Sequence, residues 1–389
     1  MNSSWRNWLE LTRISNLPTV LSSALVGTFM VTPLLWDPTL LLGIILPVIV
    51  AIAMFYIGGF VLNDVFDIEI DRVERPGRPL PSGRISLDTA ARLGMLLLCS
   101  GIVLLVISEL VSANSGQDSD GFSINFPFGW VSGGLLIALI LLYDRFHSRG
   151  SGWVFAMGGC RGLVYVTCLL VVSDQLHNPD NQPLFMRYLK WPNIVALPVV
   201  PFIISMFFYV AGFSRIARGE VAPEGAGILY CYRCGKTVDP GTTRCGSCRR
   251  QLNPSILDRS TAPPLSRGIR YLCLASTFVP ILVLLAIKVM GGISAVVKNQ
   301  EGMINSPQLQ TDLVVTIVSC ILAALWFAFA TKAYCTNPLS PRRPIQMWIA
   351  GIALLDGLYL FLYGQWIISI VCFVLFFFTI LGHRKVKGT

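Results

Sequence analysis

The chain has 389 residues, of which 54% are hydrophobic and only 13% are charged, and its formal net charge is +9. Soluble globular proteins carry about 25% charged residues, so this composition argues against a soluble enzyme. Apolar runs of roughly 20 residues, the length that crosses a bilayer as a helix, recur along the chain and predict a membrane protein.

Nine apolar blocks predict an all-helical bundle in the membrane. Eight of them are single runs, at 17–35, 38–62, 87–112, 128–143, 153–173, 192–212, 268–290 and 311–334. The ninth block, 345–382, would be about 57 Å long as one helix, nearly twice the hydrocarbon thickness. We therefore expect it to form two helices that bend near Gly364, which gives nine or ten spans in total.

The basic residues predict how the bundle is oriented. If the N-terminus is inside and the spans alternate, most of the 30 Lys and Arg residues fall in inside segments. Such an excess marks the cytoplasmic side of a membrane protein. We therefore expect the N-terminus and the charged loops to be cytoplasmic, with a bacterial inner membrane as the location. The loops account for the positive charge, so no nucleic-acid partner is predicted.

The first charged segment, "NDVFDIEIDRVERPGRPL" (63–80), directly follows the second apolar run. Its carboxylates Asp64, Asp67 and Asp71 are spaced i, i+3, i+7, which places them on one face of a helix. Magnesium is often held by one or two carboxylates together with substrate phosphates. Guanidinium groups bind phosphate oxygens, and three follow here: Arg72, Arg75 and Arg78. A solvated, salt-bridged loop without a ligand remains the alternative.

The longest inside loop, 213–267, contains "CYRCGKTVDPGTTRCGSCRR". Its two CxxC pairs have the spacing of a zinc ribbon, with Cys231, Cys234, Cys245 and Cys248 as ligands. Four thiolates complete a tetrahedral Zn²⁺ site with no open position, so the metal would be structural. A redox or disulfide pair is the alternative, although a cytoplasmic location keeps thiols reduced. We expect a folded plug inserted in the loop or a docking knob for a protein partner.

The stretch "NDVFDIEIDRVERPGRPLPSGRIS" resembles the first aspartate-rich motif of the UbiA superfamily of membrane prenyltransferases. The family pattern NDxxDxxxD with its basic continuation is matched by Asn63, Asp64, Asp67, Asp71, Arg75, Pro76, Arg78, Pro79 and Gly83. Three further stretches are similar to family helices: "LTRISNLPTVLSSALVG" with Arg13 and Asn16, "LLYDRFHS" with Tyr143, and "GGCRGLVYV" with Arg161. The resemblance covers about residues 10–220.

This resemblance implies an all-helical bundle with a central cavity open to lipid. In the family, a prenyl diphosphate binds with Mg²⁺ between two aspartate-rich loops, the diphosphate leaves, and a lipophilic or aromatic acceptor captures the allylic cation. It implies catalytic and metal-binding roles for Asp64, Asp67 and Asp71, and a catalytic role for Tyr143. The substrate-binding residues it implies are Asn16, Asn63, Arg75, Arg78 and Arg161.

The second aspartate motif of the family is missing. Its place after the sixth predicted helix reads "AGFSRIARGEVAPEG", which contains no Asp and resembles the divergent EboC-like branch. We expect Arg215 and Arg218 to replace the charge of a second metal. Glu220 is either a metal ligand or the ion-pair partner of Arg218. The family's lysine after the tyrosine is also absent, and His147 stands four residues after Tyr143.

Three functional interpretations follow. The first is an intramembrane prenyltransferase, the second a UbiA-like protein that binds or transports an isoprenoid or lipid without transfer, and the third a membrane anchor whose zinc ribbon docks a cytosolic partner. The predicted domains are 1–220 with six helices and the first aspartate loop, 221–267 with the ribbon at 231–248, and 268–389 with the last helices. We expect the ribbon to brace the altered second loop.

Overall fold

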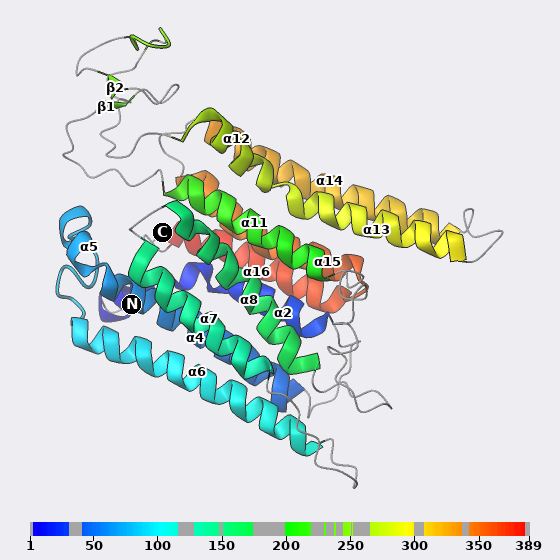
Figure 1. The fold of residues 1–389 in the computed structure, drawn as a ribbon, viewed down its shortest axis with the longest axis horizontal. Coiled ribbons are helices and arrows are strands. Elements are labelled where there is room, and N and C mark those ends of the chain that lie inside the picture. The colour runs from blue at the N-terminus through cyan, green and yellow to red at the C-terminus, as the bar shows by residue number, and fades with distance from the viewer. Residues whose placement is uncertain are drawn as a thin grey trace.

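A computed structural model describes residues 3–30, 41–115, 128–147, 151–173, 199–218, 229–230, 237–238, 244–249, 251, 265–298, 307–336 and 342–385. Within these residues the chain is almost entirely helical (Figure 1). The first half contains α1 (Ser3–Leu11), η1 (Ile14–Asn16), α2 (Leu17–Phe29), η2 (Leu41–Ile45), α4 (Leu46–Phe66), α5 (Ile68–Glu74), α6 (Leu87–Ser115), α7 (Phe128–Phe146), η4 (Ser151–Trp153), α8 (Val154–Ser173) and α11 (Val199–Ala217). The second half contains β1 (Leu229–Tyr230), β2 (Thr237–Val238), α12 (Arg267–Ser276), α13 (Val279–Lys298), α14 (Pro307–Thr336), α15 (Arg342–Leu362) and α16 (Trp366–Lys385).

The predicted polytopic helical bundle is confirmed. Eight helices in the described residues are long and apolar enough to cross a membrane, and the number is nine if α12 and α13, bent by 45° at their junction, are counted as one span. The first apolar block gives a shorter apolar helix, Ile14–Phe29. The last block forms two helices, α15 and α16, as expected. Gly364 lies between them with φ of +80°, a backbone conformation that glycine adopts readily.

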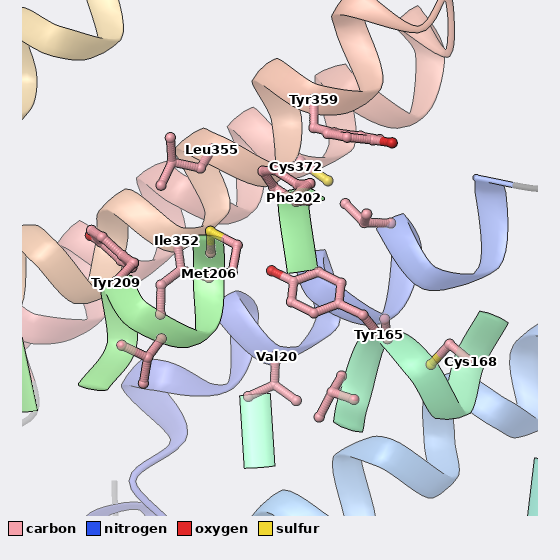
Figure 2. Packing of buried hydrophobic residues seen from close by; sticks show 14 of the residues in the cluster. Val20, Tyr165, Cys168, Phe202, Met206, Tyr209, Ile352, Leu355, Tyr359 and Cys372 are labelled. Carbon is pink, nitrogen blue, oxygen red and sulfur yellow. The ribbon is translucent and has the colours of Figure 1, made fainter. Parts of the chain in front are cut away.

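Helix α2 lies at the centre of the bundle, in contact with α4, α8, α15 and α16. Its Gly27 permits the close approach to α8, because a Cβ atom there would lie 2.6 Å from the carbonyl oxygen of Tyr165. Figure 2 shows buried side chains of α2, α8, α11, α15 and α16 meeting in this core, among them Val20, Phe202 and Tyr359. Residues far apart in sequence therefore surround α2.

A second apolar cluster fastens the charged segment to the ends of the helices. Leu80 and Ile85, which follow α5, pack with Leu11 of α1, Val61 of α4 and Ala90 of α6. The carboxylates do not lie on one continuous helix, because α4 ends at Phe66 and α5 begins at Ile68, with Asp67 between them. The apolar anchors thus place the first aspartate motif over the end of the bundle.

The cysteine loop is described only in part. Strands β1 and β2 pair antiparallel on either side of the segment that contains Cys231 and Cys234, which lie outside the described residues. Arg244 and Gln251 form an isolated antiparallel bridge that flanks Cys245 and Cys248. No group of three or more metal-binding side chains is found in the described part of the chain, so the predicted Zn²⁺ site stays a prediction.

Candidate functional site

A cavity of about 220 Å³ lies inside the bundle between α2, α4, α7, α8, α11 and α15. Most of its wall is apolar, with side chains such as Ile52 and Phe55. The wall also includes the predicted residues Asn16, Asn63, Tyr143 and Arg161, together with Arg13, Tyr56 and Asp144. The structure thus brings four of the sequence-predicted site residues to one cavity that is apolar along most of its surface.

Arg13 connects the cavity to the first aspartate motif. Its Nη2 atom lies 3.2 Å from Oδ1 of Asp64, and its guanidinium lies 4.6 Å from the centre of the Phe60 ring. The backbone of Arg13 has φ of 45°, an uncommon conformation for a residue other than glycine. The Tyr56 hydroxyl donates a hydrogen bond of 3.0 Å to its carbonyl oxygen. Strained backbone of this kind clusters at functional sites.

Arg78 lies between two buried carboxylates. Its Nη1 atom is 2.7 Å from Oδ2 of Asp71 and 3.4 Å from Oδ1 of Asp64. Both aspartates are buried, with 4% and 6% of their surface exposed. Two buried carboxylates would repel each other without a shared cation, so the guanidinium stabilises their approach.

Asp67 pairs with a histidine from another helix. The Nε2 atom of His147, directly after α7, lies 3.3 Å from Oδ2 of Asp67. This hydrogen bond to Asp67 raises the pKa of His147 above its ordinary value, because a carboxylate favours the protonated imidazole. The His147 ring also stacks on Tyr143, with 5.2 Å between ring centres. His147 therefore belongs to the site. Its signal in the sequence was that it follows Tyr143 where the family's lysine is absent.

The altered second motif reaches the site through one of its arginines. Arg218, directly after α11, lies close enough to Tyr143 to interact with it electrostatically. Arg215 interacts instead with Cys273 of α12 and does not line the cavity. Glu220 lies outside the described residues. Arg75 ends α5, where its backbone N–H donates to the Asp71 carbonyl oxygen, and it does not line the cavity either.

Two buried carboxylates were not singled out from the sequence. Asp144, in the last turn of α7, is 5% exposed and lines the cavity, and its Oδ2 atom has no hydrogen-bond partner within the described residues. Asp356, in the middle of α15, is completely buried. Two features of the sequence could have pointed to these carboxylates: the Asp in "LLYDRFHS" and the single Asp within the last apolar block.

The residues present fit a magnesium ion that is shared with a phosphate ligand. Asp64 and Asp71 converge on one cationic nitrogen, so a divalent cation could be held by the same two oxygens. Mg²⁺ typically uses one or two carboxylates plus substrate phosphates and water. No cluster of three metal-binding side chains occurs in the described ranges.

Comparisons with known proteins find a family model and several relatives that this chain resembles. The model of the UbiA prenyltransferase family matches residues 20–218. The chain is 33% identical over 150 residues to digeranylgeranylglyceryl phosphate synthase from Sulfolobus acidocaldarius, covering 37% of this chain and 44% of that one. It is 30% identical over 176 residues to the protein of that name from Methanococcus aeolicus, covering 44% and 58%. The chain thus spans about half the length of the curated relatives it matches.

A solved structure supports the fold. The apo structure of a UbiA homolog from Aeropyrum pernix K1 aligns with a TM-score of 0.52 at 15% identity, covering 90% of this chain and 99% of that one. At this identity the likeness concerns the fold alone. The aligned region extends beyond residues 20–218 and includes the C-terminal helices. The sequence motifs that resemble the family all lie before those helices.

Proposed function

Because the chain belongs to the UbiA prenyltransferase family, we propose that it is an intramembrane prenyltransferase that uses a prenyl diphosphate donor, Mg²⁺ and a lipophilic acceptor. The observation that carries this proposal is the pair of buried carboxylates, Asp64 and Asp71, gathered around Arg78 beside a largely apolar cavity. This arrangement suits a ligand with a charged diphosphate and an apolar tail.

The carboxylates and arginines exchange partners when the donor binds. Asp64, Asp67 and Asp71 would hold Mg²⁺, which would supply charge neutralisation for the leaving diphosphate. Arg13 and Arg78 turn from the carboxylates to the phosphate oxygens, where guanidinium groups form strong, charge-assisted hydrogen bonds. The cation and the two arginines would then offset part of the negative charge of the carboxylates and the diphosphate.

The apolar cavity protects the reacting carbon. When the bond between the donor's C1 and the diphosphate oxygen breaks, an allylic cation forms, and water would capture it in an open site. Side chains such as Phe55 and Ile52 exclude water from the cavity and leave the acceptor as the available nucleophile. Tyr143 lies in this wall, with its hydroxyl next to Arg218.

The acceptor is proposed from the named relatives. Digeranylgeranylglyceryl phosphate synthases are named for a glyceryl phosphate that carries two geranylgeranyl groups. A prenylated glyceryl phosphate with a hydroxyl group is therefore the first acceptor to test for this chain. Arg218 contributes positive charge where the family carries aspartates, and Glu220 is a candidate additional Mg²⁺ ligand.

We also propose a structural Zn²⁺ held by Cys231, Cys234, Cys245 and Cys248 on the cytoplasmic side of a bacterial inner membrane. The β1–β2 pair and the Arg244–Gln251 bridge support this proposal, because each flanks one CxxC pair as a metal-binding turn would require. The ribbon then braces the loop after α11 or docks a protein partner. Assignment to the EboC-like branch remains part of this proposal.

Pyrophosphate release tests the proposed transfer. Purified protein is given Mg²⁺, geranylgeranyl diphosphate and geranylgeranylglyceryl phosphate, and wild type is compared with Asp67→Asn. We expect the variant to lose about 100-fold in rate, because an electrostatic contribution to the leaving group is removed. Asp88→Asn is the matched control, since Asp88 pairs with Arg92 on the exposed surface.

A second candidate function is isoprenoid binding or transport without transfer. The missing second aspartate motif favours it, because Arg218 stands where the family would bind a second metal. If wild type binds prenyl diphosphates but releases no pyrophosphate with any acceptor, this second function replaces the first.

A further inference from the structure

A carboxylate is buried in the middle of α15, outside residues 20–218 that the family model matches. Asp356 is 0% exposed, and three hydroxyl groups donate to it: Ser22 Oγ at 2.6 Å, Ser23 Oγ at 3.0 Å and the Tyr165 hydroxyl at 2.7 Å. An ionisable side chain inside a membrane bundle is costly and usually marks a functional site. A well-packed apolar side chain would avoid that cost, so packing alone does not explain this aspartate.

The opposite charge is Arg161 on α8. Arg161 Nη1 donates to Ser23 Oγ at 3.1 Å, and Asp356 lies close enough to interact electrostatically with the guanidinium. A hydroxyl group has one hydrogen and two lone pairs, so Ser23 can accept from Arg161 while it donates to Asp356. One serine therefore bridges two opposite charges on different helices.

The same arginine belongs to the cavity wall. Arg161 Nη1 also donates to the carbonyl oxygen of Thr19 at 2.9 Å, and Nη2 lies 3.3 Å from Thr19 Oγ1. Both residues line the cavity, next to Asn16. These bonds restrict the guanidinium to one place against α2. A restrained side chain loses less conformational entropy when it binds a ligand.

We propose that Asp356 is a positioning residue that holds Arg161, through Ser23, where the guanidinium meets the diphosphate of the donor. This inference rests on the proposed function, because the anion is the diphosphate of a prenyl donor. Asp356 does not line the cavity and acts through Arg161 alone. Helix α15 thereby contributes to donor binding, although the prenyltransferase motifs lie in the first half of the chain.

A double-mutant cycle tests this coupling. The affinity for geranyl thiodiphosphate, a donor analogue that reacts slowly, is measured with Mg²⁺ by calorimetry for wild type, Asp356→Asn, Arg161→Met and the double variant. We expect Asp356→Asn to weaken binding about tenfold when Arg161 is present and not at all when it is replaced. In turnover, KM rises for Asp356→Asn while kcat stays within a few-fold, because the contact with the diphosphate is lost equally in the ground state and the transition state.

Ser23→Ala provides a second variant, since it removes the bridge but leaves Asp356 its bonds to Ser22 and Tyr165. Ser23→Ala should weaken binding of the donor analogue as Asp356→Asn does. It therefore keeps the proposal testable if Asp356→Asn does not fold. Thr167→Val is the matched control, because Thr167 is a buried hydroxyl on α8 that bonds to Ser132 on α7 instead.

Three outcomes decide the matter. Loss of affinity that depends on Arg161 supports the positioning role. Equal losses with and without Arg161, or unchanged affinity in both Asp356→Asn and Ser23→Ala, overturn it while the prenyltransferase proposal stands. A wild-type protein that binds no prenyl diphosphate overturns the proposed function, and the positioning role with it.

Discussion

Replacing Arg78 should reveal whether this arginine and the metal compete for the same carboxylates. Arg78→Met keeps an unbranched apolar stem but removes the guanidinium that lies 2.7 Å from Asp71 and 3.4 Å from Asp64. With the cation gone, two buried carboxylates remain close together. We therefore expect the variant to bind a divalent cation more tightly than wild type when no donor is present.

The magnitude follows from the contacts that a metal must displace. A hydrogen bond to a charged group contributes about 1.5–3 kcal/mol, and the 2.7 Å contact with Asp71 is the one of full strength. Because about 1.4 kcal/mol corresponds to a factor of ten, the metal affinity should rise roughly 10- to 100-fold. Donor affinity in the presence of Mg²⁺ should fall, since a phosphate-binding group has been removed.

The assay is a titration of detergent-purified protein with Mn²⁺, followed by electron paramagnetic resonance. Arg92→Met is the matched control, because Arg92 pairs with Asp88 on the exposed surface, where an ion pair contributes at most about 1 kcal/mol. Manganese binding that is no tighter in Arg78→Met than in wild type would refute the reasoning. Arg78 would then not occupy the place of the metal.

The remaining predictions concern protonation, packing and zinc. In metal-free protein, the raised pKa of His147 means that its pair with Asp67 is fully stabilising below about pH 6.5 and lost as the pH rises through the folded-state pKa. The melting temperature should fall with rising pH more in wild type than in His147→Gln, and parallel profiles would contradict this. Gly27→Ala should destabilise the bundle by about 1–3 kcal/mol in urea unfolding, because its Cβ would strike α8, whereas Gly134→Ala, with open space around it, should not. Wild type should carry about one zinc ion per chain by elemental analysis and Cys245→Ser much less; a metal-free wild type would exclude the ribbon.

Part of the fold and part of the site could be predicted from the sequence, because the apolar runs are long and the charged residues at 63–80 lie close together. The spans follow from chain length and hydropathy, and Gly364 interrupts the last block where the length argument placed a bend. Asp64 and Arg78 lie close together in sequence, so their shared role was visible in one stretch. In the structure the two side chains pair with each other, and their roles toward a metal and a phosphate stay predictions.

Contacts across the bundle were not predictable in the same way. Ser23 and Asp356 belong to helices at opposite ends of the sequence, and a single Asp in an apolar run does not reveal its partner. His147 reaches Asp67 because α7 ends beside α4, which depends on helix packing. The left-handed backbone of Arg13 likewise arises from the turn between α1 and η1 and has no glycine to signal it.

The end of the chain packs against its beginning. Figure 1 draws the two termini near each other, and α16 contacts both η1 and α2. The ring of His383 lies 2.5 Å from Oδ1 of Asn16, a residue of the cavity wall. During synthesis, α16 must therefore emerge from the ribosome before this side of the cavity has its neighbour. A nascent chain that already carries residues 20–218 would still lack this neighbour of Asn16, and a chain without α16 would lack it permanently.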